Sequence, residues 1–284
     1  MAQDTLFQTK KTLNLDGRLL ALDIPKVMGI LNLSPDSFYD GGKYKSSKDI
    51  LNQTEKMLDE GASIIDIGGY SSRPQAKNID EEEEELRVIK GVSLVKSHFP
   101  DAHVSIDTFR ASVAAKALDE GACMVNDISG GNLDDQMFDL VARRKVPYIL
   151  MHLQGTPQTM SNETKYENLL SNIMDYFNSK LRRLLKLGIN DVIIDPGFGF
   201  AKTVEQNYEI LKNLKYFKAL KQPILAGISR KSMVYKKLGI SSDEALNGTT
   251  VLNTIALING VSLLRVHDVK EAVEAIKLFK ATYN

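Results

Sequence analysis

The feature that most constrains the fold of this chain is a strand–corner–helix unit that recurs eight times. Eight short runs, apolar through their middle, each lead into a polar or glycine-rich corner and then into a helical pattern. The runs cover residues 26–33, 63–68, 103–108, 124–129, 147–152, 191–196, 223–229 and 263–268. Runs that do not alternate between apolar and polar residues are typical of strands covered on both faces. Eight such units predict a parallel sheet closed into a (β/α)₈ TIM barrel.

A doubly wound open sheet is the alternative fold. It would need a GxGxxG corner after the first run, and the corner LNLSPDSFYDGG does not supply one. Ahead of the first run, residues 12–22 indicate a β-hairpin that turns at Asp16-Gly17 and plugs the bottom of the barrel. No linker or shift in composition interrupts the chain, so residues 1–284 are interpreted as a single domain.

Helical patterns fill the segments between the runs, among them residues 45–60, 78–99, 163–187 and 268–281. Asp80 is expected to cap the second of these helices, with the glutamates Glu81 to Glu85 in solvent at its positive end. Asp268 is expected to cap the last helix.

The composition excludes several classes of function. Lys plus Arg equals Asp plus Glu at 36 each, so no overall field attracts nucleic acid or an anionic membrane. No run of 18 apolar residues and no signal-peptide core is present. The single cysteine, Cys123, excludes an internal disulfide and a cysteine-based zinc site. We therefore expect a cytoplasmic protein with no nucleic-acid or membrane partner.

Polar side chains stand at the carboxyl ends of the predicted strands, where the active site of a barrel lies. They are Asn32, Asp66, Asp107, Asn126, Asp127, His152, Asp195, Ser229, Arg230, Lys231, Arg265 and His267. Asp66 and Asp127 are expected to cap turns or helices, whereas the others are expected to converge on one mouth.

The chemistry of this ring predicts a heterocycle and a phosphate as ligands. Aspartate and asparagine oxygens with one lysine can bind a flat ring with alternating donors and acceptors. Arg265 and His267, with Asn32 opposite, suit an anion and a hard metal ion. The loops 32–44 and 68–77 are long for such corners and are expected to bind ligands or act as lids. GxSxG, HExxH and carboxylate pairs at glycosidase spacing are absent, so hydrolysis by serine or zinc is not expected.

Eight motifs, spread in order over about residues 26–280, together resemble the dihydropteroate synthase family of the folate pathway. They are LNLSPDSFYDGG, GASIIDIGGYSSRP, SIDTFR, VNDISGG, ILMHLQGTP, IIDPGFGFAKTVEQN, AGISRKSM and LLRVHDV. The resemblance implies a pterin-binding barrel, a Mg²⁺ cofactor and sulfonamides as inhibitors. It also implies the condensation of 6-hydroxymethyl-7,8-dihydropterin diphosphate with 4-aminobenzoate to 7,8-dihydropteroate and diphosphate.

The resemblance also implies roles for individual residues. Those implied for the pterin are Asp107, Asn126, Met151, Asp195, Phe200, Gly227 and Lys231. Those implied for the diphosphate are Asn32, Ser72, Arg73, Arg265 and His267, with Asn32 also at the Mg²⁺. Those implied for 4-aminobenzoate are Phe38, Pro74, Phe200, Lys231 and Ser232, and those implied for catalysis are Asp107, Lys231, Arg265 and His267. The chain departs from the common STRPGA at Ser72 and Gln75, which puts the stiffness of that loop in question.

No side chain in the ring is an obvious nucleophile, so diphosphate is expected to leave first and the arylamine to attack the resulting cation. A pterin-binding methyltransferase that acts with a corrinoid protein shares the barrel and is one alternative. A catalytically silent homologue is another. Apolar residues within 244–259 indicate a homodimer.

Overall fold

The computed structural model describes residues 9–33, 46–71 and 79–283 of the chain. All eight predicted strands are present: β3 (Lys26–Asn32), β4 (Ile64–Gly68), β5 (Val104–Asp107), β6 (Met124–Asp127), β7 (Tyr148–Met151), β8 (Val192–Asp195), β9 (Leu225–Ala226) and β10 (Leu263–Val266). They form one parallel sheet in the order β8-β7-β6-β5-β4-β3-β10-β9. A parallel bridge between Ile194 and Ile224 joins its two edges and closes the barrel. The predicted (β/α)₈ fold is confirmed.

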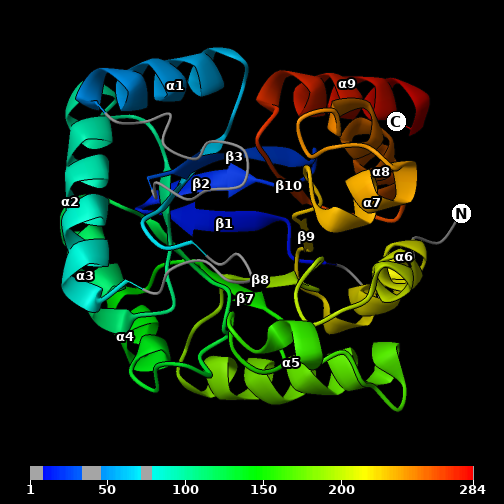
Figure 1. Cartoon of the computed structure of the whole chain (residues 1–284). Coiled ribbons are helices and arrows are strands. Elements are labelled where there is room, and N and C mark those ends of the chain that lie inside the picture. The colour runs from blue at the N-terminus through cyan, green and yellow to red at the C-terminus, as the bar shows by residue number, and fades with distance from the viewer. Residues whose placement is uncertain (1–8, 34–45, 72–78, 284) are drawn as a thin grey trace, which may run out of the picture.

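Helices surround the barrel on the outside (Figure 1). They are α1 (Ser47–Asp59), α2 (Glu81–His98), α3 (Ala111–Asp119), α4 (Met137–Arg144), α5 (Leu169–Lys186), α6 (Val204–Lys212), α7 (Ser232–Leu238), α8 (Leu246–Ile258) and α9 (Val269–Tyr283), with 3-10 turns at Met160–Asn162 and Leu214–Leu220. Within the described residues, no helix is long and apolar enough to cross a bilayer.

Two details of the helices differ from the prediction. Helix α5 begins at Leu169 rather than at residue 163, because Asn168 caps it by accepting a bond from the Ser171 amide. Asp80 caps α2 as expected, but Glu84 does not lie in solvent. It is fully buried, where it forms an ion pair with Arg110 and accepts a hydrogen bond from Thr108.

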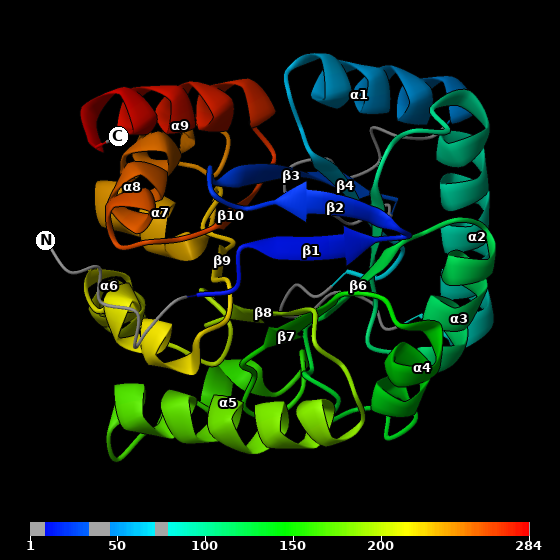
Figure 2. The same ribbon diagram turned by 180° about the vertical axis from the view of Figure 1, so that it is seen from behind.

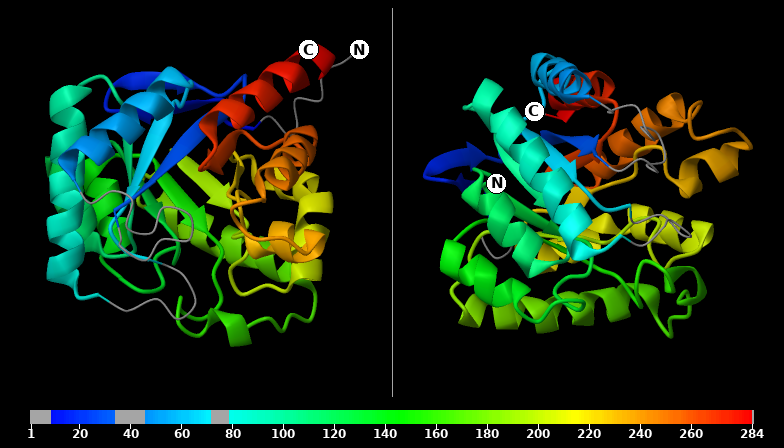
Figure 3. Two further views of the ribbon diagram at one scale, coloured as in Figure 1. Left: turned by 45° about the horizontal axis from the view of Figure 1, so that its top comes forward. Right: turned by 60° about the vertical axis from the view of Figure 1, so that its left-hand side comes forward.

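The predicted hairpin consists of β1 (Thr12–Leu15) and β2 (Arg18–Ala21), paired antiparallel. Asp16 and Gly17 both have positive φ, the geometry of a tight two-residue hairpin turn. The hairpin lies across one end of the barrel (Figure 2) and projects from that end in the right-hand view of Figure 3. Leu13 and Leu15 pack there against interior residues near the starts of the strands, such as Met124 and Leu263. The hairpin therefore closes the bottom of the barrel, as expected.

Strand geometry divides the remaining side chains into two sets, because successive residues of a strand point to opposite faces. One set faces outward and packs under the helices, for example Ile65, Ile67 and Val104. The other set faces the interior. Its lower members are apolar, such as Ile64 and Ile193, and contact the hairpin. The members further along each strand are the polar residues of the mouth.

Candidate active site

Strand register places four of the mouth residues in one row. Asn32 pairs with Gly68, Gly68 pairs with Asp107, and Asp107 pairs with Asn126. These positions stand at the carboxyl edge of β3 to β6. On the far side of the barrel, Met151 pairs with Asp195 at the ends of β7 and β8. The structure thus brings together residues that are far apart in the sequence, at the edge where the sequence predicts the site.

Arg265 holds two carboxylates in the barrel interior. Its Nε donates to Asp66 Oδ2 at 2.6 Å and its Nη2 donates to Asp107 Oδ2 at 2.5 Å. The same Asp66 oxygen accepts a bond from Asn126 Nδ2 at 2.9 Å, and Asp66 is fully buried. The prediction that Asp66 caps a turn is therefore wrong. Its side chain faces the interior and orients two residues of the site, a role that the sequence reasoning missed.

The electrostatics of this network favour a tight ion pair. Burial raises the pKa of Asp107 to about 7, although the Arg265 guanidinium opposes the rise. Burial alone would lower the pKa of Arg265, but the carboxylates of Asp66 and Asp107 raise it above its usual value. Arg265 therefore stays a cation, and Asp107 is poised to change its protonation near neutral pH.

Asp195 and Lys231 form the other half of the mouth. Asp195 Oδ1 accepts a hydrogen bond from the Gly197 amide at 2.7 Å, and burial raises the pKa of this carboxyl. The Lys231 ammonium donates to the carbonyl of Phe198 and lies 4.4 Å from the centre of the Phe200 ring. Burial lowers the pKa of Lys231 to about 8, although the Asp195 carboxylate opposes this.

Three further predicted residues lie beside these groups. A Cβ at Gly227 would stand 3.8 Å from Lys231 Nζ and 4.0 Å from Arg265 Cβ, so Gly227 lies between these two residues. Met151 is buried on the interior face of β7, and Ser232 is the first residue of α7, directly after Lys231.

His267 and Asn32 mark the side predicted for the anion. The His267 ring nitrogen Nδ1 lies 3.0 Å from Ser229 Oγ, which also accepts a bond from the His267 amide. Asn32 Oδ1 and Asp107 Oδ2 both lie within 4 Å of the place where a Cβ at Gly68 would stand. Asn32 Oδ1 and Asp107 Oδ2 therefore both lie beside Gly68.

Four polar residues at the strand ends turn away from the mouth. Asp127 accepts bonds from the amides of Ser129 and Gly131 and caps that turn, as predicted. Asp268 precedes α9 as expected of a cap, but its carboxylate accepts two bonds from Arg230, a strand-end residue that was expected in the mouth. His152 was also expected there, and this prediction is wrong.

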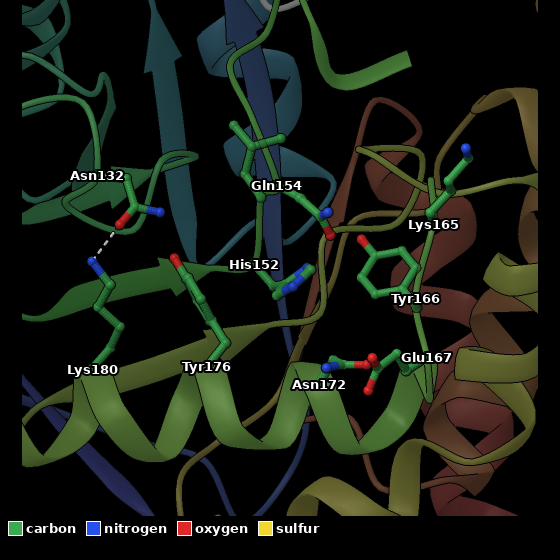
Figure 4. Close-up of a pocket in the computed structure, with 10 residues that line it drawn as sticks. Asn132, His152, Gln154, Lys165, Tyr166, Glu167, Asn172, Tyr176 and Lys180 are labelled. Atoms are coloured by element: carbon green, nitrogen blue, oxygen red, sulfur yellow. Dashed lines mark hydrogen bonds between the residues drawn. The ribbon is translucent and has the colours of Figure 1, made fainter. Parts of the chain in front are cut away.

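His152 instead lies against α5, on the wall of a cavity outside the mouth, here called the α5 cavity. Its ring packs between Tyr166 and Tyr176, with its centroid 4.9 Å from that of Tyr176 (Figure 4). The cavity has a volume of about 430 Å³. Its described lining includes Gln154, Asn172 and the charged residues Lys165, Glu167 and Lys180, so its chemistry is mixed.

Four predicted site residues, Phe38, Ser72, Arg73 and Pro74, lie outside the described residues. Their roles in binding diphosphate and aminobenzoate stay predictions, as do the ligand contacts of the residues above.

Comparisons with known proteins agree with the geometry. A family model described as pterin binding enzyme matches residues 28–267. The dihydropteroate synthase of Haemophilus influenzae is 39% identical over 271 residues, which cover 95% of this chain and 98% of that protein.

Two solved structures are similar over the whole barrel. The Yersinia pestis dihydropteroate synthase in a sulfonamide drug complex superimposes with a TM-score of 0.92 at 38% identity, covering 95% of this chain and 98% of that one. The Thermus thermophilus enzyme in complex with 4-aminobenzoate gives 0.86 at 34% identity, covering 96% and 100%. Taken with the ring of acceptors and cations at the barrel mouth, these similarities establish that the chain belongs to the dihydropteroate synthase family of pterin binding enzymes.

Proposed function

We propose that this chain condenses 6-hydroxymethyl-7,8-dihydropterin diphosphate with 4-aminobenzoate, giving 7,8-dihydropteroate and diphosphate. The observation that carries the proposal is the composition of the mouth. Two carboxylates and an amide oxygen, from Asp107, Asp195 and Asn126, stand with the ammonium of Lys231 at one edge of the barrel. A pterin ring offers an amino group and ring N–H donors beside a carbonyl acceptor, and this set complements it.

Asp195 is best suited to accept bonds from the 2-amino group and the adjacent ring N–H. It is buried and one of its oxygens is already bonded to the Gly197 amide, which leaves the second oxygen for a ligand. A buried carboxylate is tolerated where it is hydrogen-bonded in this way. The Lys231 ammonium, above Phe200, is placed to donate to the ring carbonyl while the Phe200 ring flanks the pterin.

The reaction needs no nucleophile from the protein. The bond between the pterin methylene carbon and the diphosphate oxygen breaks, and the electron pair leaves with the diphosphate. The positive charge spreads into the dihydropterin ring, where the nearby carboxylates of Asp107 and Asp195 stabilise it. The arylamine nitrogen then forms the C–N bond and releases a proton. His267 would contact the leaving group, and the two long loops would exclude water from the cation.

The oxygen donors present fit a Mg²⁺ ion that arrives with its substrate. Among the described residues, no group of three or more His, Cys, Asp or Glu side chains is arranged to hold a metal. Mg²⁺ usually keeps several waters and binds one or two protein oxygens together with substrate phosphates. Asn32, whose Oδ1 lies beside Gly68 near Asp107, would supply such an oxygen. Bound there, the ion would neutralise charge on the diphosphate.

One assay tests the proposal most directly. Release of diphosphate from the pterin substrate is measured with and without 4-aminobenzoate, together with formation of dihydropteroate. We expect dihydropteroate only when both substrates are present, with sulfonamides competing against 4-aminobenzoate. A protein that binds the pterin but transfers a methyl group to a corrinoid partner would support the methyltransferase alternative instead. The known relatives named above are synthases and do not favour that reading.

We also propose that two copies associate through α8. Val251, Ile255 and Ile258 lie on that helix, exposed by 37–50%, at a spacing that places them on one face. Sedimentation of the wild type and of Ile255→Glu tests this, and a wild type that sediments as a monomer would contradict it. The cytoplasmic location stays a prediction from the sequence.

A further inference from the structure

The loop that follows β8 winds around a buried lysine. Lys202 is 8% exposed, and its ammonium donates to the carbonyls of Phe200 at 2.9 Å and of Gly197 at 3.1 Å. It also lies 3.0 Å from His152 Nδ1 and 3.5 Å from the His152 carbonyl. One side chain therefore joins the loop to the end of β7.

This loop carries much of the predicted pterin pocket. It begins at Asp195, whose carboxylate is fixed by the Gly197 amide, and it contains Phe200 and the Phe198 carbonyl that receives Lys231. Its path is tight: a Cβ at Gly197 would stand 2.2 Å from the His152 carbonyl oxygen. Ala201 has a positive φ, unusual for a residue with a side chain, and its carbonyl accepts the Tyr166 hydroxyl. A loop with this path needs a hydrogen-bond donor for the carbonyls that point toward its centre, those of Gly197 and Phe200.

We propose that Lys202 is a positioning residue for the pterin pocket: its ammonium gathers the carbonyls of the β8–α6 loop against His152 and so fixes Asp195, Phe200 and the anchor of Lys231. The inference rests on the proposed function, because it assigns Lys202 to the pterin half of that site. Lys202 itself does not touch the ring, since its ammonium is already surrounded by loop and strand acceptors.

His152 completes this anchor from the other side. Burial lowers the pKa of His152 well below its usual value, and the nearby Lys202 adds to the effect, so the ring is neutral. A neutral ring that accepts from Lys202 at Nδ1 carries its proton on Nε2. His152 faces outward from the end of β7, and Tyr166 and Tyr176 hold its ring on both sides at the wall of the α5 cavity (Figure 4).

The charge of Lys202 gives the test a readout that packing alone would not produce. Burial lowers the pKa of Lys202 to about 7, although the Asp195 carboxylate opposes this. The charged neighbours that act on it are Asp195 and Lys231. The wild type therefore has the ammonium at about pH 6 and has lost most of it at about pH 9.

The experiment measures binding of 6-hydroxymethyl-7,8-dihydropterin by calorimetry to the wild type and to Lys202→Met, at both pH values. At about pH 6 we expect Lys202→Met to bind on the order of tenfold more weakly, as expected when buried acceptors lose their donor. The ratio of the two affinities should shrink at about pH 9. Titration of Lys231 occurs in both proteins. Loss of the Lys202 charge also raises the pKa of Asp195 in Lys202→Met, so His152→Phe, which keeps Lys202, is measured beside it. Lys165→Met, an exposed lysine on the same side of the molecule, is the matched control and should bind normally.

The proposal would be overturned if the ratio of wild-type to Lys202→Met pterin affinity were the same at both pH values. It would also be overturned if Lys202→Met bound the pterin as tightly as the wild type at about pH 6. If Lys202→Met does not fold, His152→Phe decides, because it keeps an aromatic ring between the two tyrosines and removes the Nδ1 acceptor of Lys202 together with the Nε2–H group. We expect a loss of several-fold for His152→Phe, and unchanged affinity there would remove the anchor. A wild type that does not bind the pterin would instead contradict the proposed function.

Discussion

Asn126→Asp tests the hydrogen bond that orients the Asn126 amide toward Asp66. The amide nitrogen donates to Asp66 Oδ2 at 2.9 Å, and the two residues are 3% and 0% exposed. An ionised carboxylate only accepts, so the group facing Asp66 is the amide nitrogen, and Asn126 Oδ1 is left for a ligand. The substitution replaces the donor by a second carboxyl group, and two buried carboxylates at this distance do not both ionise.

The magnitude follows from the burial of the pair. A hydrogen bond to a charged group contributes about 1.5–3 kcal/mol, and with both residues buried this is not reduced by solvent. Asn126→Asp should therefore lose about 1.5–3 kcal/mol of stability at neutral pH. Pterin affinity should also fall, because the hydrogen bond that orients Asn126 Oδ1 for a ligand is lost. Below about pH 4 the unfolded chain also holds the proton that the buried pair retains, so the loss of stability should shrink there.

The sign of the pH dependence makes this prediction specific. The folded variant holds a proton at the pair that an unfolded chain gives up above about pH 4, so the variant loses stability relative to the wild type as the pH rises from there. Thermal unfolding from about pH 4 to pH 8 measures it. Asp66→Asn combined with Asn126→Asp restores one donor facing one acceptor. It also removes the carboxylate that pairs with Arg265, so only the part of the loss that comes from the hydrogen bond should be recovered. If the stability of Asn126→Asp differs from that of the wild type by the same amount at every pH, the reasoning is refuted.

The remaining predictions concern the pterin ring and the second loop. Asp195→Asn turns an acceptor into a donor that faces the ring's own donors, so calorimetry should show a roughly 10- to 100-fold loss of pterin affinity. Because the pKa of Lys231 is lowered to about 8, pterin affinity should decline as the pH rises through that value, and Lys231→Met should weaken this decline. Stability should change in the opposite direction, rising from about pH 8 to 10, since the unfolded chain then binds more protons. Shortening the loop through Ser71–Pro74 should abolish turnover and sulfonamide binding but spare pterin binding. A shortened protein that still makes dihydropteroate at a normal rate would contradict the last expectation.

The sequence predicts the barrel well, because each strand is a short apolar run between two corners. Eight such strand–helix units are the number that closes a parallel sheet into a barrel. It predicts less well which strand-end residues face the mouth, although the signal is present. Ile64 is interior, so Asp66, two residues on, is interior as well. Asn126 and Met151 face inward, and their successors Asp127 and His152 therefore face outward. Assigning alternate residues of each strand to the interior would have separated Asp127 and His152, which face outward, from the site residues, which face the mouth.

Other features depend on contacts that no local pattern carries. Lys202 follows the motif DPGFGFA in a loop, where nothing in the spacing indicates that the ammonium is buried among carbonyls. Glu84 belongs to a run of five glutamates that looks solvated, and its burial follows only from Thr108 and Arg110 on the neighbouring β5–α3 segment. The burial of such residues can be recognised only from the tertiary structure, which sets the strand register and the contacts between loops.

The structure also changes what is expected of Arg265, which the sequence pairs with His267 in an anion pocket. Arg265 already balances Asp66 and Asp107, so a diphosphate that approaches it shares a cation with two carboxylates. Arg265→Ala leaves those carboxylates unbalanced, a change that costs about 3–5 kcal/mol when a buried pair is broken. We therefore expect Arg265→Ala to lower the melting temperature and to weaken binding of the pterin alcohol and of its diphosphate alike. His267→Ala should weaken mainly the diphosphate, since the anion is the ligand expected at His267, whose Nδ1 lies 3.0 Å from Ser229 Oγ. Calorimetry with both ligands separates the two roles, and a selective loss of diphosphate binding in Arg265→Ala would return that residue to the anion pocket.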